Sequence, residues 1–305
     1  MALKIIFMGT PEFSVPILKS IYETNNKILE VYTQPPKKKN RGQKIMNSPI
    51  HDYSKKLGIS VRNPIVFDDE EINHIEKLKP DLIIVVAYGK ILPKRLLDLK
   101  NILFINVHAS LLPKWRGAAP IQRAIMNMDP ETGVSIMKIV PELDAGPVLK
   151  QSKIKITKET NYEELSGKMS EIGAKLILDT LKIIKNKRVN FVEQNDSKVT
   201  YAKKIEKIET RLNWNDDAEK VIAKINAFNP YPGCWFEFNR VRIKIIKAKH
   251  VSSKGIPGTI LDNKLTIACS KNAIQVIKLQ KEGKQKITAD EFLRGNKIKI
   301  GQSLN

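Results

Sequence analysis

The stretch Ile102-Leu-Phe-Ile-Asn106-Val-His108-Ala-Ser110 joins an apolar run to a group of polar side chains. The run 102–107 predicts a buried β-strand, and alternation along an extended chain places Asn106, His108 and Ser110 on one side. In open α/β sheets, ligands bind at the carboxyl edge of the strands. An amide, an imidazole and a hydroxyl cost free energy when they are buried without partners. We therefore expect this group to face a substrate or a polar network.

On either side of this stretch, short apolar runs alternate with segments whose apolar residues have helical spacing. Further strands are predicted over Lys4–Met8, Leu29–Thr33, Leu82–Ala87, Thr132–Ile139 and Pro147–Ile156. Helices are predicted over Ser14–Glu23, Pro49–Leu57, Asp68–Leu78 and Tyr162–Ile184. This alternation favours an α/β fold with a doubly wound, mostly parallel, Rossmann-like sheet. The turn Met8-Gly-Thr-Pro-Glu12 lacks the Gly-x-Gly-x-x-Gly pattern, which argues against dinucleotide binding.

The pattern changes after residue 187, and this change predicts two domains. Residues 188–204 are polar and irregular, as in a linker between domains. A helix is predicted over Ala218–Phe228. It is expected to end there because Pro230 and Pro232 prevent it from continuing. Short strands are predicted over Cys234–Phe238, Arg242–Ala248, Gly258–Leu261, Leu265–Ala268 and Ala273–Leu279. We therefore expect an α/β domain over residues 1–187 and a smaller, β-rich, barrel-like C-terminal domain over residues 205–305.

Composition restricts the class of protein. At 305 residues, with 42% hydrophobic and 28% charged residues, the chain has the balance of a soluble globular protein. No apolar run approaches the ~20 residues of a membrane span, so no membrane partner is expected. Cys234 and Cys269 suggest no disulfide framework, which favours a cytoplasmic location. The histidines are scattered and neither cysteine has a paired ligand nearby, so no metal site is predicted.

The net charge of +21 has two interpretations. Lys and Arg gain affinity for polyanions by displacing counterions from phosphates, which favours a nucleic-acid partner. The same charge can follow from a chain that is simply rich in Lys, Ile and Asn. Residues 206–305 carry 19 Lys and Arg against 10 Asp and Glu, so the excess is spread over both parts of the chain. Charge alone leaves the two interpretations open.

The segment Thr33–Ser48 is rich in proline and in basic residues. It is too long and too polar for an ordinary connection between a strand and a helix. A mobile basic loop above a sheet edge would act as a substrate clamp. The alternative is a solvated, disordered insertion.

Three motifs carry a resemblance to a known family. They are Asn106-Val-His108, Ser110-Leu-Leu-Pro-x-x-Arg116-Gly and Leu143-Asp144-Ala-Gly146. Together they resemble the folate-dependent formyltransferases. Further matches extend over most of the chain and include Phe7–Pro16, Tyr32–Pro35, Val86–Pro93, Gly117–Gln122, Glu131–Val134 and Ala227–Pro230. The central motifs mark the chemistry, whereas the opening Gly-Thr-Pro-Glu-Phe, the basic loop and the C-terminal domain favour the members that formylate methionyl-tRNA.

The resemblance implies a reaction and the residues that carry it out. The formyl donor would be 10-formyltetrahydrofolate, and the acceptor would be the free α-amine of methionine esterified to initiator tRNA. Asn106 and His108 would stabilise the oxygen of the tetrahedral adduct, and Asp144 would orient the imidazole and help to relay the proton. Ala109 departs from the glycine that is more familiar at this position and adds only a methyl group. No metal, covalent nucleophile or obligate protein partner is implied.

The resemblance also implies binding residues. The folate is expected to lie against Val86, Ala87, Tyr88, Gly89, Leu92, Ser110, Leu111, Leu112 and Pro113. The pattern of basic residues, rather than the resemblance, predicts the contacts to tRNA. They are expected from the basic loop and from a stripe of alternating basic residues in the C-terminal part, and they are Arg41, Lys37, Lys38, Lys39, Lys44, Arg240 and Arg242. Arg41 is preferred among them because a guanidinium suits phosphates and stacked bases better than an ammonium does.

Two other functions stay open. The acceptor could be a small amine, such as glycinamide ribonucleotide or an amino sugar. The chain could also be a non-catalytic RNA-binding protein on a degenerate formyltransferase scaffold. Each residue has a structural alternative as well, since Asn106 and His108 could be hydrogen-bonding residues at a strand end and Asp144 could stabilise a turn. Their joint occurrence favours the catalytic interpretation.

Overall fold

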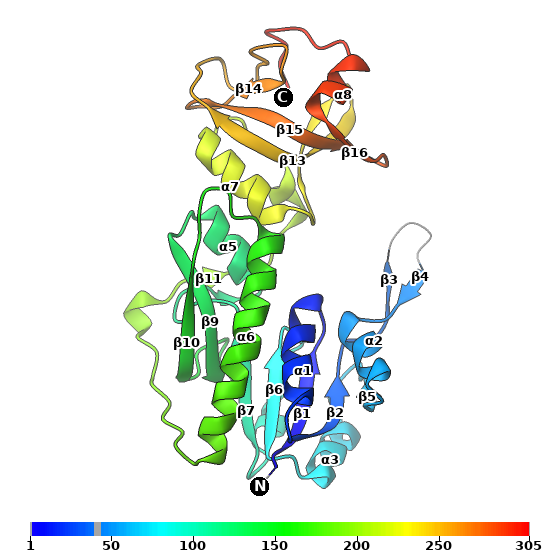
Figure 1. The fold of residues 1–305 in the computed structure, drawn as a ribbon, viewed down its shortest axis with the longest axis vertical. Coiled ribbons are helices and arrows are strands. Elements are labelled where there is room, and N and C mark those ends of the chain that lie inside the picture. Colours follow the sequence, from blue (N-terminus) through cyan, green and yellow to red (C-terminus); the bar gives the residue numbers. More distant parts are fainter. Residues whose placement is uncertain (1, 40–43, 305) are drawn as a thin grey trace. The chain divides into compact units, whose positions relative to one another are not determined.

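The structure, a computed structural model, describes residues 2–39 and 44–304 (Figure 1). It divides into two compact units. The first contains residues 1–120, 132–154 and 166–202, and the second contains residues 121–131, 155–165 and 203–305. The second unit therefore takes two short segments from the first half of the chain, and the domain bounds drawn at residues 187 and 205 stay predictions.

The first unit is built on a seven-stranded sheet with the order β10-β9-β7-β6-β1-β2-β5. Its strands are β1 (Lys4–Gly9), β2 (Lys27–Tyr32), β5 (Val61–Arg62), β6 (Leu82–Val86), β7 (Leu103–His108), β9 (Glu131–Lys138) and β10 (Val148–Lys155). The strands from β5 to β7 in this order pair in parallel, and β9 runs antiparallel to β7. All of β6 is buried, as expected for a strand covered on both faces. The predicted fold class is confirmed.

Helices lie on both faces of this sheet (Figure 1). They are α1 (Val15–Tyr22), preceded by the short helix η1 (Glu12–Ser14), α2 (Pro49–Lys56), α3 (Asp69–Leu78), α4 (Lys94–Leu97) and α6 (Tyr162–Lys185). On one face, Ile75 of α3 and Leu96 of α4 belong to the same hydrophobic core as Phe104 of β7. On the other face, α6 approaches so closely that a Cβ at Gly173 would lie 3.3 Å from Cγ1 of Val107. Alternate residues of β7 therefore face different layers.

Two segments predicted as irregular contain short strands. The basic segment 33–48 contains β3 (Lys37–Lys39) and β4 (Lys44–Met46), which pair antiparallel, and Arg41 lies outside the described residues. The segment 188–204 contains the short helix η2 (Asp196–Lys198) and β11 (Tyr201–Ala202). Strand β11 pairs in parallel with β8 (Arg116–Gly117). The segment predicted as a linker therefore belongs to the first unit as far as residue 202.

The second unit consists of an antiparallel sheet with helix α7 (Ala218–Phe228) packed on β13 and β15. The strands are β12 (Cys234–Phe238), β13 (Val241–Val251), β14 (Thr266–Ala268), β15 (Ala273–Lys281) and β16 (Lys286–Thr288), and the other helices are α5 (Pro120–Met126), η3 (Lys207–Thr210) and α8 (Ala289–Arg294). Their order is β12-β13-β15-β14, with β16 also paired to β15. The strand predicted over Gly258–Leu261 is wrong: Thr259 and Ile260 form only isolated bridges. Pro257 and the left-handed Gly258, with φ at 84°, interrupt the extended chain there.

Candidate active site at the carboxyl edge of the sheet

Strand β7 carries Asn106 and His108 at its carboxyl end. Phe104 lies in the core formed with α3 and α4, and Val107 faces α6. Alternation along the strand therefore puts Asn106 and His108 on the face of Phe104. Asn106 is half-buried, and within residues 2–39 and 44–304 its carboxamide has no hydrogen-bond partner. This amide can therefore donate to a bound group without breaking a contact in the protein.

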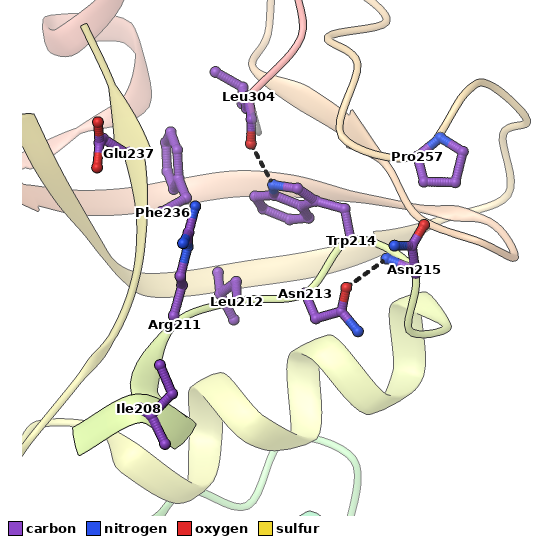
Figure 2. A pocket seen from close by; sticks show the side chains of 10 residues that line it. All are labelled: Ile208, Arg211, Leu212, Asn213, Trp214, Asn215, Phe236, Glu237, Pro257 and Leu304. Carbon is purple, nitrogen blue, oxygen red and sulfur yellow. Dashed lines mark hydrogen bonds between the residues drawn. The ribbon is translucent and has the colours of Figure 1, made fainter. Parts of the chain in front are cut away.

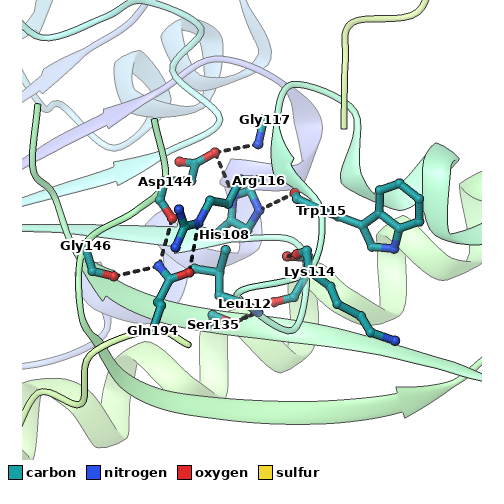
Figure 3. Close-up of polar contacts among 11 residues, drawn as sticks. His108, Leu112, Lys114, Trp115, Arg116, Gly117, Ser135, Asp144, Gly146 and Gln194 are labelled. Atoms are coloured by element: carbon teal, nitrogen blue, oxygen red, sulfur yellow. Dashed lines mark hydrogen bonds and ion pairs between the residues drawn. The ribbon is translucent and has the colours of Figure 1, made fainter. Parts of the chain in front are cut away.

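His108 is 5% exposed and has a polar neighbour at each ring nitrogen (Figure 3). Nε2 lies 3.0 Å from the carbonyl oxygen of Trp115, and Nδ1 lies 3.6 Å from Oδ2 of Asp144. Because a carbonyl only accepts, Nε2 carries a proton and donates it. Nδ1 faces the carboxylate, so a proton taken up there would form an ion pair with Asp144. The two contacts fix the orientation of the ring.

Asp144 lies in a turn with an unusual backbone. Its φ is 48°, in the left-handed region that Asp tolerates better than most residues with a side chain. Besides facing the imidazole, its Oδ2 accepts a hydrogen bond from the backbone nitrogen of Gly117 at 2.8 Å. Gly117 has φ at 125°, and a Cβ at this position would come within 2.7 Å of the carbonyl oxygen of Ala202. Glycine is therefore required here, and its amide is fixed where it meets the carboxylate.

Gln194, in the segment predicted as a linker, connects the loops that carry Arg116 and Asp144 (Figure 3). Its Nε2 donates to the carbonyl oxygens of Asp144 at 2.8 Å and of Gly146 at 2.7 Å. Its Oε1 accepts from Nε of Arg116 at 3.0 Å. Sequence reasoning missed this residue. The available signal was Arg116 itself, since a buried guanidinium needs acceptors and the polar segment 188–204 could supply them.

The loop that starts at Ser110 is held by its own polar network. The Ser110 hydroxyl is buried and donates to the carbonyl oxygen of Lys114 at 2.6 Å, so it is turned to its own loop. Ser135 Oγ donates to the carbonyl oxygen of Ser110 at 2.6 Å and accepts from the backbone nitrogen of Leu112 at 3.1 Å. Gln151 Nε2 donates to the carbonyl oxygen of Leu112 at 2.9 Å. These bonds fix the segment Ser110–Pro113, which includes Leu111 at its centre.

The segment after β6 begins beside the candidate site, because Val85 pairs with Asn106. Among its predicted folate contacts, Val86, Tyr88 and Leu92 are buried. Ala87 and Gly89 are exposed, and both have a positive φ, of 46° and 78°. Gln34 Nε2 donates to the carbonyl oxygens of Tyr88 at 3.1 Å and of Gly89 at 2.9 Å. The hydroxyl of Tyr88 is buried and has no partner among the described residues. The structure thus places this segment at the end of the neighbouring strand.

The predicted basic contacts lie in two places. In the first unit, Lys37, Lys38 and Lys44 are exposed in the β3–β4 hairpin, and Lys37 Nζ donates to Oε1 of Gln34. Lys39 is the last residue of β3. In the second unit, Arg240 and Arg242 are exposed at the turn between β12 and β13. The guanidinium carbon of Arg242 lies 4.4 Å from the centre of the Trp235 ring, and that of Arg211 lies 5.7 Å from it. Arg211 was not predicted, because no local pattern connects it to this tryptophan.

A pocket of about 340 Å³ lies in the second unit (Figure 2). It is lined by Ile208, Arg211, Leu212, Asn213, Trp214, Asn215, Phe236, Glu237, Pro257 and Leu304. The Trp214 indole nitrogen donates to the carbonyl oxygen of Leu304 at 2.9 Å, and its ring packs edge-on against Phe236. None of the residues predicted to bind or react lines this pocket.

The structure offers little to other site chemistries. Within residues 2–39 and 44–304, no group of three His, Cys, Asp or Glu side chains is placed to hold a metal ion. Burial raises the pKa of both cysteine thiols, Cys234 and Cys269, to about 12, so neither is a ready nucleophile at neutral pH. In the same part of the chain, every helix is too short or too polar to cross a membrane.

Family models match both parts of the chain. A model described as formyl transferase matches residues 3–181, and one described as formyl transferase, C-terminal domain, matches residues 204–297. Among solved structures, an N-formyltransferase from Helicobacter canadensis, in complex with folinic acid and dTDP-3-aminofucose, has a TM-score of 0.68 at 19% identity and covers 94% of this chain and 100% of its own. HypX from Aquifex aeolicus, in complex with tetrahydrofolic acid, has a TM-score of 0.67 at 19% identity, and the match covers 96% of this chain and 47% of HypX. These two structures show a common fold.

Curated relatives show the family. The methionyl-tRNA formyltransferase of Pelagibacter ubique is 48% identical over 307 residues, which cover 100% of this chain and 99% of the relative. That of Paramagnetospirillum magneticum is 42% identical over 304 residues, covering 99% and 100%. The chain therefore belongs to the formyl transferase family of enzymes and, within it, to the methionyl-tRNA formyltransferases.

Proposed function

We propose that this protein transfers the formyl group of 10-formyltetrahydrofolate to the α-amino group of methionine on initiator tRNA. The observation that carries the proposal is the pairing of His108 with Asp144 beside the unpartnered amide of Asn106, at the carboxyl edge of the sheet. Identity of 48% along the whole chain to a relative named for this activity supports the choice of acceptor. The site would act in the cytoplasm, where charged tRNA is used.

The reaction needs the functional groups that β7 and the Asp144 turn bring together. The acceptor nitrogen forms a bond to the formyl carbon, and the bond from this carbon to the folate nitrogen breaks. Between these events the carbonyl oxygen carries negative charge and the nitrogen carries positive charge. The Asn106 amide donates to the oxygen, a contribution typically worth ~10²–10³ in rate for one donor. Nδ1 of His108, oriented by Asp144, takes up the proton that the amine loses and passes it to the leaving folate nitrogen.

The loops next to the reacting groups have backbones that are held by side chains. The segments 86–92 and 110–113 flank the strand ends, and hydrogen bonds with the Gln34, Ser135 and Gln151 side chains hold their backbones. Rigid backbone groups beside apolar side chains are typical of a cofactor-sized pocket. We assign the donor folate to these segments.

For the acceptor, we assign the exposed cations of the β3–β4 hairpin and of the β12–β13 turn to tRNA. Guanidinium and ammonium groups bind phosphates, and a guanidinium packed on Trp235 is held in place for such a contact. Arg41 belongs to the same proposal but lies outside the described residues.

An assay with three acceptors tests the function. Purified protein and radiolabelled 10-formyltetrahydrofolate are offered methionyl initiator tRNA, methionyl elongator tRNA or a small amine such as glycinamide ribonucleotide or an amino sugar. The proposal predicts label on the initiator tRNA and little on the others. Turnover with a small amine alone would show that the acceptor is a small amine and not tRNA. The absence of turnover with all three acceptors would favour a non-catalytic binding protein.

A further inference from the structure

The turn that carries Asp144 has little regular structure to support it. Strand β9 ends at Lys138 and β10 begins at Val148, so Asp144 lies outside the ladder of the sheet. Its left-handed φ of 48° is a conformation that is unfavourable for a residue with a side chain. Such a conformation persists when the surrounding contacts enforce it. The position of the carboxylate therefore depends on what holds this backbone.

Gln194 holds it on both sides of the turn. Its Nε2 has two protons, and they meet the carbonyl oxygens of Asp144 and Gly146 at 2.8 and 2.7 Å. The backbone at Gly146 packs closely against that of Lys138, since a Cβ at Gly146 would come within 1.9 Å of the carbonyl oxygen of Lys138. One side chain from a segment distant in the sequence thus sets the path of the chain at the residue that faces His108.

Arg116 determines which end of the Gln194 amide meets the turn. A guanidinium has donors and no acceptor, so it can contact only Oε1, which lies 3.0 Å from Nε. Oε1 is therefore turned to Arg116, and Nε2 is left for the two carbonyls. The Arg116 side chain is 7% exposed, and its Nη2 also pairs with Asp196 at 3.3 Å. Asp196 is 89% exposed, so the contact with Gln194 is the better shielded of the two.

We infer that Gln194, oriented by Arg116, is a positioning residue that sets the Asp144 carboxylate against His108 for formyl transfer. The inference rests on the proposed function, because it concerns the same site. It differs from a purely structural role in one respect. A residue that only stabilises the fold has the same effect whatever residue stands at position 144. A positioning residue affects the rate only while the carboxylate is present.

Gln194→Leu and Gln194→Glu test the inference in two ways. Leucine keeps the bulk of the side chain and removes every hydrogen bond. Glutamate keeps the shape and a contact to Arg116, and it places an oxygen where Nε2 donated, so that it repels the two carbonyls. Because glutamate gains charge attraction to the guanidinium, it serves as the folded variant if leucine does not fold. Glu193→Gln is the matched control, since Glu193 is the adjacent exposed residue.

The experiment measures kcat, both KM values and the pH dependence of kcat for full-length protein, first in the wild-type background and then with Asp144→Asn. We expect kcat to fall by on the order of 10²-fold in the Gln194 variants, with KM for the folate unchanged and the pH profile of kcat displaced. In the Asp144→Asn background the same substitutions are expected to cause no further loss. Glu193→Gln is expected to match the wild type.

Two results would overturn the inference. One is unchanged kcat in folded Gln194→Glu protein. The other is an equal loss of kcat in the wild-type and Asp144→Asn backgrounds, which is the behaviour of a residue that only stabilises the fold. Failure of the proposed function is recognised separately, because in that case the wild-type protein itself forms no formylated methionyl-tRNA.

Discussion

Asp144 faces His108 from a turn outside the sheet, with Oδ2 at 3.6 Å from Nδ1, and the same oxygen accepts the backbone amide of Gly117 at 2.8 Å. The carboxylate is thus held by a fixed amide on one side and faces the imidazole on the other (Figure 3). The opposite ring nitrogen donates to the carbonyl of Trp115. A ring restrained at both nitrogens cannot turn over freely, so its orientation is set before a substrate arrives.

Substitution of Asn106 should affect catalysis and leave stability unchanged. Its carboxamide has no partner within residues 2–39 and 44–304, so Asn106→Ala removes no hydrogen bond from the folded protein. We expect kcat to fall by about 10²–10³, as for the loss of one donor to an oxyanion. Urea unfolding of the same preparation should give a midpoint like that of the wild type. A lower midpoint with normal kcat would assign Asn106 to structure.

The stability of the first unit should depend on the ionisation of Glu71. Burial raises the pKa of this carboxyl, but hydrogen bonds from Arg62 and Tyr32 outweigh burial and lower it below its usual value. Arg62 Nε lies 2.7 Å from Oε1, and the Tyr32 hydroxyl lies 2.8 Å from the same atom. A carboxyl whose pKa is lowered on folding contributes stability above its unfolded pKa of about 4.3, and the contribution is lost as the pH falls through the folded value.

Glu71→Gln should therefore lower the free energy of unfolding at neutral pH, and the difference from the wild type should shrink at acid pH. Urea unfolding over a pH series measures this, with Glu70→Gln as the exposed neighbouring control. A difference that stays constant down to about pH 3 would show that ionisation of Glu71 does not matter.

Two buried tyrosines beside Phe67 should respond to the same substitution in opposite ways. Tyr32 and Tyr88 have ring centres 6.0 and 6.2 Å from that of Phe67. The Tyr32 hydroxyl donates to Glu71, whereas the Tyr88 hydroxyl has no partner in the described chain. Tyr32→Phe should cost about 1.5–3 kcal/mol, because it removes a hydrogen bond to a charged group. Tyr88→Phe should be neutral or stabilising by up to about 1 kcal/mol, because it removes a buried hydroxyl without a partner.

Urea unfolding of both variants checks this pair. A loss on Tyr88→Phe as large as that on Tyr32→Phe would show that the Tyr88 hydroxyl has a partner in solution. A raised KM for folate with unchanged stability would instead assign this hydroxyl to the ligand.

Charge reversal in the β3–β4 hairpin should weaken the tRNA complex selectively. Lys38 and Lys44 are exposed on the two strands of the hairpin. Lys38→Glu and Lys44→Glu should raise KM for tRNA and leave KM for folate unchanged, and each should make the salt dependence of tRNA binding shallower by roughly 0.7 to 0.9 in logarithmic slope. Lys77→Glu, on the exposed side of α3, is the control. Equal effects of hairpin and control variants would mean that tRNA senses only the net charge.

The parts of the fold with strong local patterns could be predicted from the sequence. Strand β6 is apolar throughout and is buried throughout, and helix α3 is capped by Asp68, whose side chain accepts from the backbone nitrogen of Glu71. The ends of these elements follow from periodicity and capping. The pairing of His108 with Asp144 followed from the resemblance of their motifs to a family, since no period connects the two residues.

Contacts between irregular segments could not be predicted in this way. Gln194 lies in a polar stretch that has no periodicity, and its partners are carbonyl groups that every residue possesses. The pairing of β11 with β8 involves only two residues on each side, which is too short for a pattern to show. The contact of the Arg211 guanidinium with the Trp235 ring depends on the register of the second unit in the same way. Such contacts arise from tertiary structure and become visible only when the chain is folded.

The proposed function assigns formyl transfer to the Asn106, His108 and Asp144 side chains. The most direct measurement is the single-turnover rate of transfer from labelled 10-formyltetrahydrofolate to methionyl initiator tRNA by the His108→Ala protein, with both substrates saturating. We predict a rate lower than that of the wild type by about 10²–10⁴, as for loss of a group that moves a proton in the transition state. A wild-type rate in the folded variant would show that formyl transfer does not need His108.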